Sequence, residues 1–279
     1  MKKISRRSFL AAAGLSVAAL ALTACGGSSA STAFSVASSA AASEAASTSA
    51  AAGELTTVEA GKLTMATNAA FPPYEMTTDA GEFEGIDIET AQAIADKLGL
   101  ELQIDDMDFD AALLSVQQGK ADIVMAGVTV TDERKAVMDF SDSYATGIQS
   151  IIVPEGSDIA SPDDLAGKKI GTQRGTTGYI YCSDDFGDDN VVAYDDGLTA
   201  VQALNNGQVD AVVIDNAPAQ EFVAANPGLV ILDTSYAEED YAIGMAKGSS
   251  LEDAVNAALE ELKADGTLQS IVDKYITAE

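Results

Sequence analysis

The stretch AALLSVQQGKADIVMAG (111–127) recurs further along the chain, aligned without gaps, as TAVQALNNGQVDAVVID (199–215). In each copy a short amphipathic segment ends at a glycine, Gly119 or Gly207, and an Asp then opens an apolar run. This order predicts a helix, a terminating glycine and a buried strand. Any α/β protein can reuse such a unit, but here the two copies fall in the two halves of the chain. The repeat therefore favours two similar lobes.

Strand-like runs alternate with amphipathic runs around both copies. The first series starts at Lys62 and reads KLTMAT, IDIETAQAIADKLG, LELQIDD, FDAALLSVQQG and ADIVMAG. The second reads KKIGTQRGTTGYIYC, VVAYDD, GLTAVQALNNG and VDAVVID. Strands and helices that alternate in this way are typical of the α/β class. The extended segments GIQSIIVP (147–154) and DYAIGMAKG (240–248) belong to neither series, and we expect them to cross between the lobes.

The amino terminus has the composition of an export signal. MKKISRRSFLAAAGLSVAALALTAC (1–25) has a basic start and an apolar run too short to span a membrane. LTAC resembles a lipobox, the cleavage and lipidation site of bacterial lipoproteins, with Cys25 as the first mature residue. The alternative is an ordinary signal peptide with an incidental cysteine. SRRSFL fits both a twin-arginine signal and a general secretory signal.

A low-complexity segment separates this signal from the lobes. Residues 26–53 are almost wholly Ser, Ala, Gly and Thr, with too little apolar surface to offset the entropy cost of ordering them. We expect a flexible tether. The expected division of the chain is a lipoprotein signal peptide (1–24), the tether (25–55), lobe one (56–148 and 244–279) and lobe two (149–243), with hinge strands near 147–153 and 240–246.

The chain is strongly acidic, with 15 Lys and Arg against 44 Asp and Glu and a formal net charge of −29. We expect no nucleic-acid partner, because phosphates would be repelled. The sequence has no histidine, which excludes imidazole metal sites and Ser/His or Cys/His nucleophile pairs. DMDFD (106–110) lacks the later glycine and glutamate of a calcium loop, and GTQRGTTG (171–178) lacks the spacing of a phosphate or dinucleotide loop. We expect neither a metal nor a cofactor.

Candidate binding residues follow the predicted strand ADIVMAG. Gly127 ends that strand and lets a ligand approach the backbone, Thr129 offers a hydroxyl, and Arg134 offers a planar guanidinium that can hold a carboxylate through two hydrogen bonds. The alternative is a surface arginine paired with Asp132 or Asp139.

Lobe two offers two groups suited to the ends of a small zwitterion. The loop 171–178 precedes a predicted helix, where free backbone N–H groups can receive a carboxylate. Asp215 stands at the carboxyl end of a predicted buried strand, where ligands of open α/β sheets bind. The alternatives are a plain strand-to-helix turn and an Asp that caps the helix near Pro218.

These motifs resemble the bacterial extracellular solute-binding proteins of family 3, the receptors of polar amino-acid ABC importers. The resemblance runs from Lys62 to the C terminus and is carried by ATNAAFPPYEM, GEFEGIDIETAQAIADKLG, AGVTVTDERKAVMDFSDSY and LKADGTLQSIVDKYI. It implies a two-lobed periplasmic-binding-protein fold of type II with the ligand between the lobes.

The resemblance also implies a role for each candidate. Arg134, Thr129 and Gly127 correspond to the lobe-one clamp on the α-carboxylate and amine of the ligand. Thr177 corresponds to the lobe-two residue whose amide joins the clamp, and Asp215 to the acceptor for the α-ammonium group.

The ligand side chain would meet a second set of residues. Phe71 and Phe109 correspond to its aromatic walls, although aromatic residues of this kind also form hydrophobic cores. Asn68 stands where related proteins often have an acid, Gln173 where a Lys can occur, and Ile214 where a polar residue can occur. Two neutral amides favour a polar, uncharged, glutamine-like side chain, while cystine and basic amino acids stay open.

We therefore expect the substrate-binding component of an amino-acid ABC importer. It would be a non-catalytic monomer, lipid-anchored to the outer face of a bacterial cell membrane, that delivers a polar L-amino acid to permease subunits. One alternative is an amino-acid sensor that signals to a membrane receptor. Another is a dehydratase-like enzyme on the same scaffold, which would need an acid–base pair; Asp215 is a candidate acid without an identifiable partner.

Overall fold

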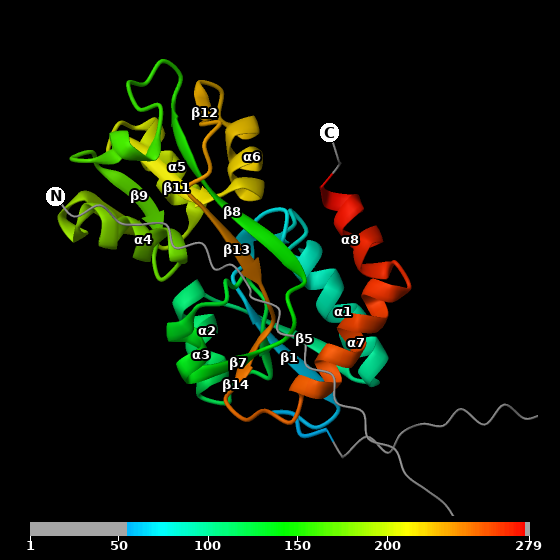
Figure 1. Cartoon of the computed structure of the whole chain (residues 1–279). Helices are drawn as coiled ribbons and strands as arrows, with labels where there is room; N and C mark the ends of the chain where they lie inside the picture. Colours follow the sequence, from blue (N-terminus) through cyan, green and yellow to red (C-terminus); the bar gives the residue numbers. More distant parts are fainter. Residues whose placement is uncertain (1–54, 277–279) are drawn as a thin grey trace, which may run out of the picture. The chain divides into compact units, whose positions relative to one another are not determined.

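Two β-sheets, each with helices packed against it, organise the described part of the chain (Figure 1). The computed structural model describes residues 55–276, which belong to one compact unit, 51–279. The prediction of a two-lobed α/β fold is confirmed. Of the helices in residues 55–276, none has the length and apolar character needed to cross a membrane.

The first sheet has five strands. In sheet order they are β5 (Glu101–Asp106), β1 (Lys62–Thr67), β6 (Ile123–Val124), β14 (Gly244–Ala246) and β7 (Met138–Phe140). β1 is parallel to β5 and β6, whereas β14 is antiparallel to β6 and β7. A small sheet beside it contains β2 (Ala70–Phe71), β3 (Glu75–Thr77) and β4 (Phe83–Glu84).

The helices of the first lobe lie on both sides of its sheet (Figure 1). α1 (Ile86–Leu98), α7 (Glu252–Ala264) and α8 (Thr267–Tyr275) pack against one another on one side. α2 (Phe109–Gln117) packs on β1, β6 and β14, and α3 (Asp132–Val137) packs on β7. The two terminal helices therefore return to the sheet that the N-terminal part of the unit begins.

The second sheet has six strands. They are β10 (Val191–Tyr194), β9 (Ile170–Gln173), β11 (Ala211–Asp215), β8 (Ala145–Pro154) and β12 (Leu229–Ile231), with β13 (Ala237–Tyr241) paired to β8. Its helices are α4 (Thr177–Phe186), α5 (Gly197–Asn205) and α6 (Asn216–Ala225), with 3-10 turns at Pro162–Leu165 and Asp188–Asn190. β9, β10 and β11 are parallel, whereas β8 runs antiparallel to β11.

The repeated sequence unit forms the same structure twice. α2 and α5 end just before Gly119 and Gly207, whose φ angles of +66° and +67° terminate the helices at little cost. The Asp that follows has one role in both copies. Asp122 accepts from the Thr64 N–H of β1 at 2.8 Å, and Asp210 accepts from the Lys169 N–H just before β9 at 2.7 Å, so each Asp is bonded to the backbone at or beside a neighbouring strand.

The chain passes between the two sheets twice, from β7 to β8 and from β13 to β14. β8 and β13 pair antiparallel and lie side by side in Figure 1. The fully buried ring of Tyr241, at the end of β13, packs on Gly147 of β8, where a Cβ atom would lie 2.5 Å from that ring. Both passages are therefore held together next to the region between the sheets.

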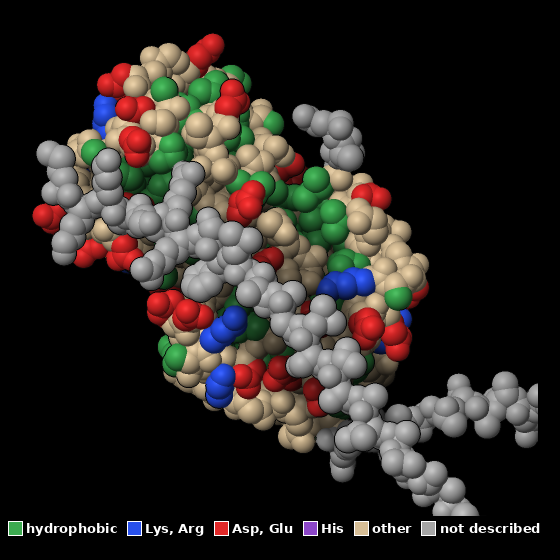
Figure 2. Space-filling view, viewed as in Figure 1, with side chains coloured by type: hydrophobic (Ala, Val, Ile, Leu, Met, Phe, Trp, Pro, Cys, Tyr) green, Lys and Arg blue, Asp and Glu red, His purple; other side chains and the backbone are tan. Residues whose placement is uncertain are grey.

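Asp and Glu side chains lie scattered over the face shown in Figure 2, with few Lys and Arg among them. The ion pairs of the described residues, such as Lys168 with Asp158 and Lys97 with Glu261, involve mostly exposed carboxylates. A solvated surface therefore accounts for much of the negative charge.

Candidate functional site

One pocket between the two sheets brings together all nine predicted ligand-binding residues. Its wall includes Asn68, Phe71, Phe109, Gly127, Thr129 and Arg134 from the first lobe and Gln173, Thr177 and Asp215 from the second. Six further residues complete it, namely Glu75, Ala126, Gln149, Thr176, Val213 and Ile214. Residues more than 100 positions apart in the sequence thus line one small space.

Arg134 is buried in this pocket and is not a surface arginine, since only 8% of the residue is exposed. Thr131 caps α3 by accepting from the Arg134 N–H at 3.2 Å, which fixes the start of the short helix that carries the guanidinium. The guanidinium lies over the Phe109 ring, with Cζ 5.4 Å from the ring centroid. Asp139 pairs with Lys247 at 2.6 Å, so the predicted alternative of an Arg134–Asp139 pair does not form.

Two of the five guanidinium N–H groups are used within the protein. Nη1 donates to the Thr129 carbonyl at 2.7 Å and Nη2 to the Gly175 carbonyl at 3.1 Å. Three donors have no hydrogen-bond partner among residues 55–276. Burial lowers the pKa of Arg134, although an arginine stays protonated in proteins. The pocket therefore contains a partly unsatisfied cation that suits an anionic group.

Asp215 ends β11 with its side chain buried in the pocket. One oxygen, Oδ2, accepts from Gln149 Nε2 at 2.7 Å, and the other, Oδ1, accepts from the Tyr241 hydroxyl. The residue stands at the N-cap position of α6, but its side chain makes no capping hydrogen bond. The capping alternative is therefore wrong for the side chain. Burial raises the pKa of Asp215 to about 7.

Thr129 and Thr177 bring hydroxyl groups from the two lobes to one place, with their Oγ1 atoms 3.4 Å apart. Thr177 is the first residue of α4, so its backbone N–H is one of the amides at a helix start that lack an intrahelical acceptor. Both hydroxyls also contact Glu239 Oε2, Thr129 at 3.0 Å and Thr177 at 2.9 Å.

Gly127 occupies a tightly packed turn at the end of the strand region. Its φ is +53°, and a Cβ atom there would lie 2.9 Å from the Phe71 ring and 3.3 Å from the Tyr241 ring. The Gly127 N–H donates to Asp87 Oδ2 at 3.0 Å. Only glycine fits this position without rearrangement.

Two buried acids lie beneath this turn. Asp87 also accepts from the Tyr144 hydroxyl at 2.8 Å, and burial raises the pKa of Asp87 to about 6. Burial, followed by the charge of Asp87, raises the pKa of Glu75 well above its usual range. Burial of both acids next to each other favours at least one neutral carboxyl group.

Two neutral amides bridge the lobes within the pocket wall. Gln173 Nε2 donates to Asn68 Oδ1 at 2.8 Å and to the Asp195 carbonyl at 3.3 Å, which uses both of its hydrogens. Asn68 Nδ2 donates once, to the Met107 carbonyl at 3.0 Å. A carbonyl oxygen on Gln173 and one N–H on Asn68 therefore have no partner within residues 55–276.

Phe71 and Phe109 both line the pocket and both belong to hydrophobic clusters, so each fits both interpretations given for it, pocket wall and core. Phe71 is part of a hydrophobic cluster with residues from both lobes, its ring centroid lies 6.0 Å from that of Tyr74, and it also lines the pocket. Phe109, the first residue of α2, lines the pocket beneath Arg134.

Sequence reasoning missed three polar residues of the region, namely Glu75, Gln149 and Glu239. Glu75 and Gln149 line the pocket, and Glu239 lies directly behind its two threonines. The motif ATNAAFPPYEM contains Glu75 but does not distinguish it from a surface acid. Gln149 and Glu239 lie on paired strands. Successive side chains of a strand point to opposite faces, and only this alternation within GIQSIIVP and AEEDY could have indicated that the two residues point inward.

Some predictions concern residues that the structure does not describe. The signal peptide (1–24), Cys25 as lipidation site and nearly all of the tether (25–55) lie outside residues 55–276. The described residues include one cysteine, Cys182, which is buried and free. They bring together no group of three His, Cys, Asp or Glu side chains that could hold a metal.

Comparison with known proteins agrees with this geometry. The profile of the bacterial extracellular solute-binding proteins, family 3, matches residues 63–278. A probable histidine-binding protein of Neisseria gonorrhoeae is 33% identical over 276 residues, which cover 96% of this chain and 95% of the relative. The L-cystine-binding protein TcyJ of Escherichia coli K12 is 33% identical over 226 residues, covering 79% of this chain and 85% of the relative. A solved structure, an ancestral arginine-binding protein bound to glutamine, has 42% identity and a TM-score of 0.75, covering 78% of this chain and 99% of that chain.

Proposed function

The chain belongs to the bacterial extracellular solute-binding proteins of family 3, and on that premise we propose that it is the extracytoplasmic substrate-binding component of an amino-acid ABC importer. Its proposed ligand is a polar L-amino acid held in the pocket between the lobes. The names of the related proteins support an amino acid as ligand, since they specify histidine, cystine, arginine and glutamine.

The observation that carries this proposal is a buried cation and a buried carboxylate in one pocket. Arg134 has three free N–H donors for an α-carboxylate, and Asp215 offers acceptor oxygens to an α-ammonium group. An unpaired buried charge is costly, and a zwitterion would compensate both charges at once. An anion or a cation alone would compensate only one of them.

The proposed side chain of the ligand is uncharged and glutamine-like. Gln173 Oε1 is a free acceptor and Asn68 Nδ2 has a free hydrogen, and this pair complements the NH₂ and C=O groups of a primary amide. A site built from such groups discriminates well, because a poor ligand leaves its buried polar atoms unpaired.

Closure of the lobes is the proposed mechanism of capture. The pocket wall contains a direct bond between the lobes, from Gln173 to Asn68, and the Thr129 and Thr177 hydroxyls of the two lobes both donate to Glu239. A ligand that first contacts Arg134 on one lobe would gain the contacts of Thr177 and Asp215 only on closure, so binding would stabilise the closed state.

Export and anchoring are part of the proposal. Residues 1–24 would be removed, Cys25 would carry lipid, and residues 25–55 would tether lobe one (56–148 and 244–279) and lobe two (149–243) to the outer face of the membrane. Intact-mass spectrometry of the membrane fraction should detect a lipidated Cys25, and Cys25→Ala should release the protein. Recovery of unmodified protein in the soluble fraction alone would contradict the anchor.

A thermal-shift titration tests the central proposal. Each of the twenty amino acids and L-cystine would be added to the tag-free protein that begins at residue 55. A tight ligand at about 100 times its Kd should add about 2.7 kcal/mol of apparent stability and raise Tm by several degrees. The variant Arg134→Ala is the control and should lose the shift. If none of the twenty amino acids nor cystine raises Tm, the proposal is wrong.

A further inference from the structure

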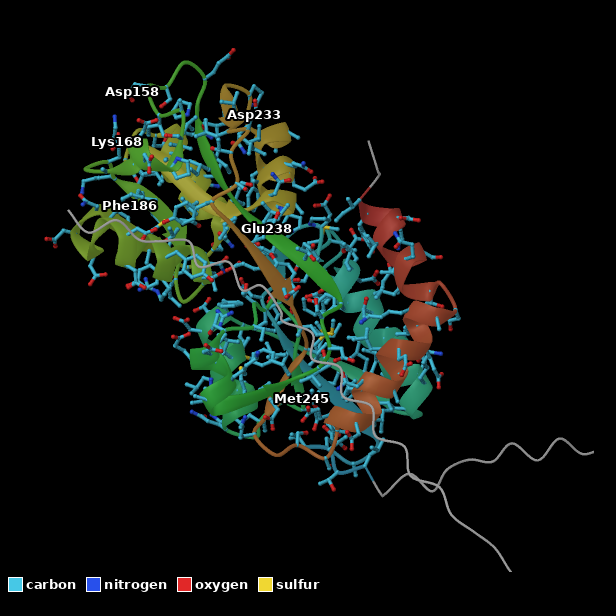
Figure 3. The ribbon with its side chains drawn as sticks, viewed as in Figure 1. Asp158, Lys168, Phe186, Asp233, Glu238 and Met245 are labelled. Atoms are coloured by element: carbon cyan, nitrogen blue, oxygen red, sulfur yellow. The ribbon has the colours of Figure 1, made fainter. Side chains whose placement is uncertain are left out.

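Glu239 is a buried carboxylate that the proposed ligand contacts do not include. It lies on β13 between Glu238 and Asp240, and strand alternation turns it inward while both neighbours are exposed. Figure 3 labels Glu238 on this strand. Only 7% of Glu239 is exposed, and it is absent from the pocket wall because the two threonines lie in front of it.

One oxygen of Glu239 accepts three hydrogen bonds. Oε2 receives the Thr129 hydroxyl at 3.0 Å, the Thr177 hydroxyl at 2.9 Å and Gln149 Nε2 at 3.0 Å. Thr129 belongs to the first lobe and Thr177 opens α4 of the second. A single carboxylate oxygen therefore joins the two lobes and β8.

These bonds decide which hydrogen-bonding groups the threonines present to the pocket. A hydroxyl group has one hydrogen and two lone pairs. When that hydrogen is donated to a carboxylate, which can only accept, the hydroxyl oxygen is left as an acceptor. Thr129 and Thr177 both line the pocket, so both offer lone pairs to a ligand there.

An ammonium group is the ligand group that matches this arrangement. It has three N–H donors and no acceptor, and the threonine oxygens and Asp215 supply acceptors in the same pocket. A ligand carboxylate at the same place would set its own acceptor oxygens against the acceptor oxygens of the threonines and Asp215. Its partners lie instead at Arg134, whose guanidinium has free donors.

We propose that Glu239 is a positioning residue that holds the Thr129 and Thr177 hydroxyls as acceptors and so makes the pocket select ligands with an α-ammonium group. This inference rests on the proposed function and adds a residue outside the pocket wall to its specificity. No ion pair within 4 Å joins Glu239 to Arg134 in residues 55–276, although the charge of Glu239 opposes the effect of burial on the pKa of Arg134.

The test compares two ligand pairs that differ only in the α-amine. The probes are L-glutamine with 4-carbamoylbutanoic acid, and L-arginine with 5-guanidinopentanoic acid. Glu239→Gln keeps the shape of the side chain, but its amide can donate to the threonines and reverse their hydroxyls. Glu238→Gln is the matched control, with the same chemical change on the exposed side of β13. Affinities would be measured by calorimetry, with competition titrations for the weaker acids.

The expected result is a change in the selectivity for the amine. Glu239→Gln should weaken binding of the better amino acid at least about tenfold, as expected for a charge-assisted hydrogen bond, while the matching acid without the amine changes by less than about threefold. Glu238→Gln should change neither. Equal losses for both members of a pair would show a general effect on closure and overturn the inference, as would an unchanged amino-acid affinity. Failure of the proposed function is a separate outcome, because the wild type would then bind neither amino acid.

Discussion

Arg134 and Gly175 are joined by a hydrogen bond of 3.1 Å from guanidinium Nη2 to the backbone carbonyl. Arg134 belongs to α3 of the first lobe, and Gly175 to the loop between β9 and α4 of the second. The group proposed to hold the ligand carboxylate thus also contacts the opposite lobe. Ligand binding and lobe closure share one side chain, so changes on either side of this bond should affect affinity.

The first prediction concerns the guanidinium itself. Arg134→Ala should reduce the affinity for the amino acid by about 2–5 kcal/mol, because it leaves a desolvated carboxylate without its charged partner. Calorimetry measures the loss. Arg174→Ala is the matched control, since the Arg174 side chain is 55% exposed and pairs with Asp195 at 3.5 Å. If the affinity of Arg134→Ala stays within about threefold of the wild-type affinity, Arg134 does not bind the ligand.

The second prediction concerns the partner of that bond. Gly175 has a φ of +74°, and a Cβ atom there would lie 1.6 Å from Asp110 Oδ1 of α2, in the first lobe. Gly175→Ala should therefore push the exposed Asp110 side chain aside and weaken binding by less than about fivefold, because the tip of that side chain can turn away. Gly99→Ala is the control, because Gly99 has a φ of +70° in the left-handed region with no atom within 4 Å of the added Cβ.

Both alanine variants should lose about 1–2 kcal/mol of folding stability from the left-handed backbone. Urea unfolding separates this shared loss from the loss of affinity, which we expect only at Gly175. Equal affinities of the two variants would contradict a role for this contact in closure.

Sequence patterns were sufficient for the fold because the relevant signals are local. In the repeated unit, Gly119 and Gly207 each end a helix and let the chain turn into the following strand. Gly127 and Asp215 follow or end those strands, and the carboxyl ends of the strands bring them to the same region. The pocket therefore collects residues that could each be named from their position at a strand end or in a family motif.

The residues that the sequence did not reveal depend on long-range pairing. AEEDY resembles a solvated acidic strand, and only its register against β8 places Glu239 opposite Gly147 and behind the threonines. A shift of one residue would have turned Glu238 inward instead. The burial of Glu75 could not be predicted for a similar reason, because it depends on packing near Asp87 of α1 and not on the residues next to Glu75 in the sequence.

The third prediction is a pH dependence of stability in the ligand-free protein. The pKa of Asp215 is raised by burial from 3.8 to about 7, so between these values the folded state binds more protons than the unfolded state. The stabilisation from protonated Asp215 is complete below about pH 3.8 and is lost as pH rises through 7. Stability should therefore fall between about pH 4 and pH 7, and Asp215→Asn should remove the part of this slope that comes from Asp215, leaving the part from Asp87 and Glu75. A wild-type slope of the opposite sign in urea unfolding would contradict the assignment.

The fourth prediction links protons to the ligand. An ammonium group beside Asp215 favours the ionised carboxylate and should lower its pKa from about 7. Binding below pH 7 should then release a proton, and affinity should rise from pH 5 to pH 8. Calorimetry in two buffers with different ionisation enthalpies measures the protons released. If the wild type releases no proton on binding at pH 6, Asp215 is excluded as the ammonium acceptor. Asp215→Asn is the control, because it has no carboxyl group to titrate at this position.

The fifth prediction tests the amide pair at the proposed side-chain end of the pocket. Gln173→Glu places a carboxylate where a neutral amide now contacts Asn68, and a buried carboxylate needs a cationic or donor partner. The ratio of L-arginine affinity to L-glutamine affinity should rise at least about tenfold, since a guanidinium can pair with the new charge and a carboxamide cannot. Gln202→Glu adds the same charge on the exposed side of α5 in the same lobe and should leave the ratio unchanged. If both variants raise the ratio equally, the effect comes from the net charge of the lobe. If neither does, Gln173 does not contact the ligand side chain, and the amide pair serves only to hold the lobes together.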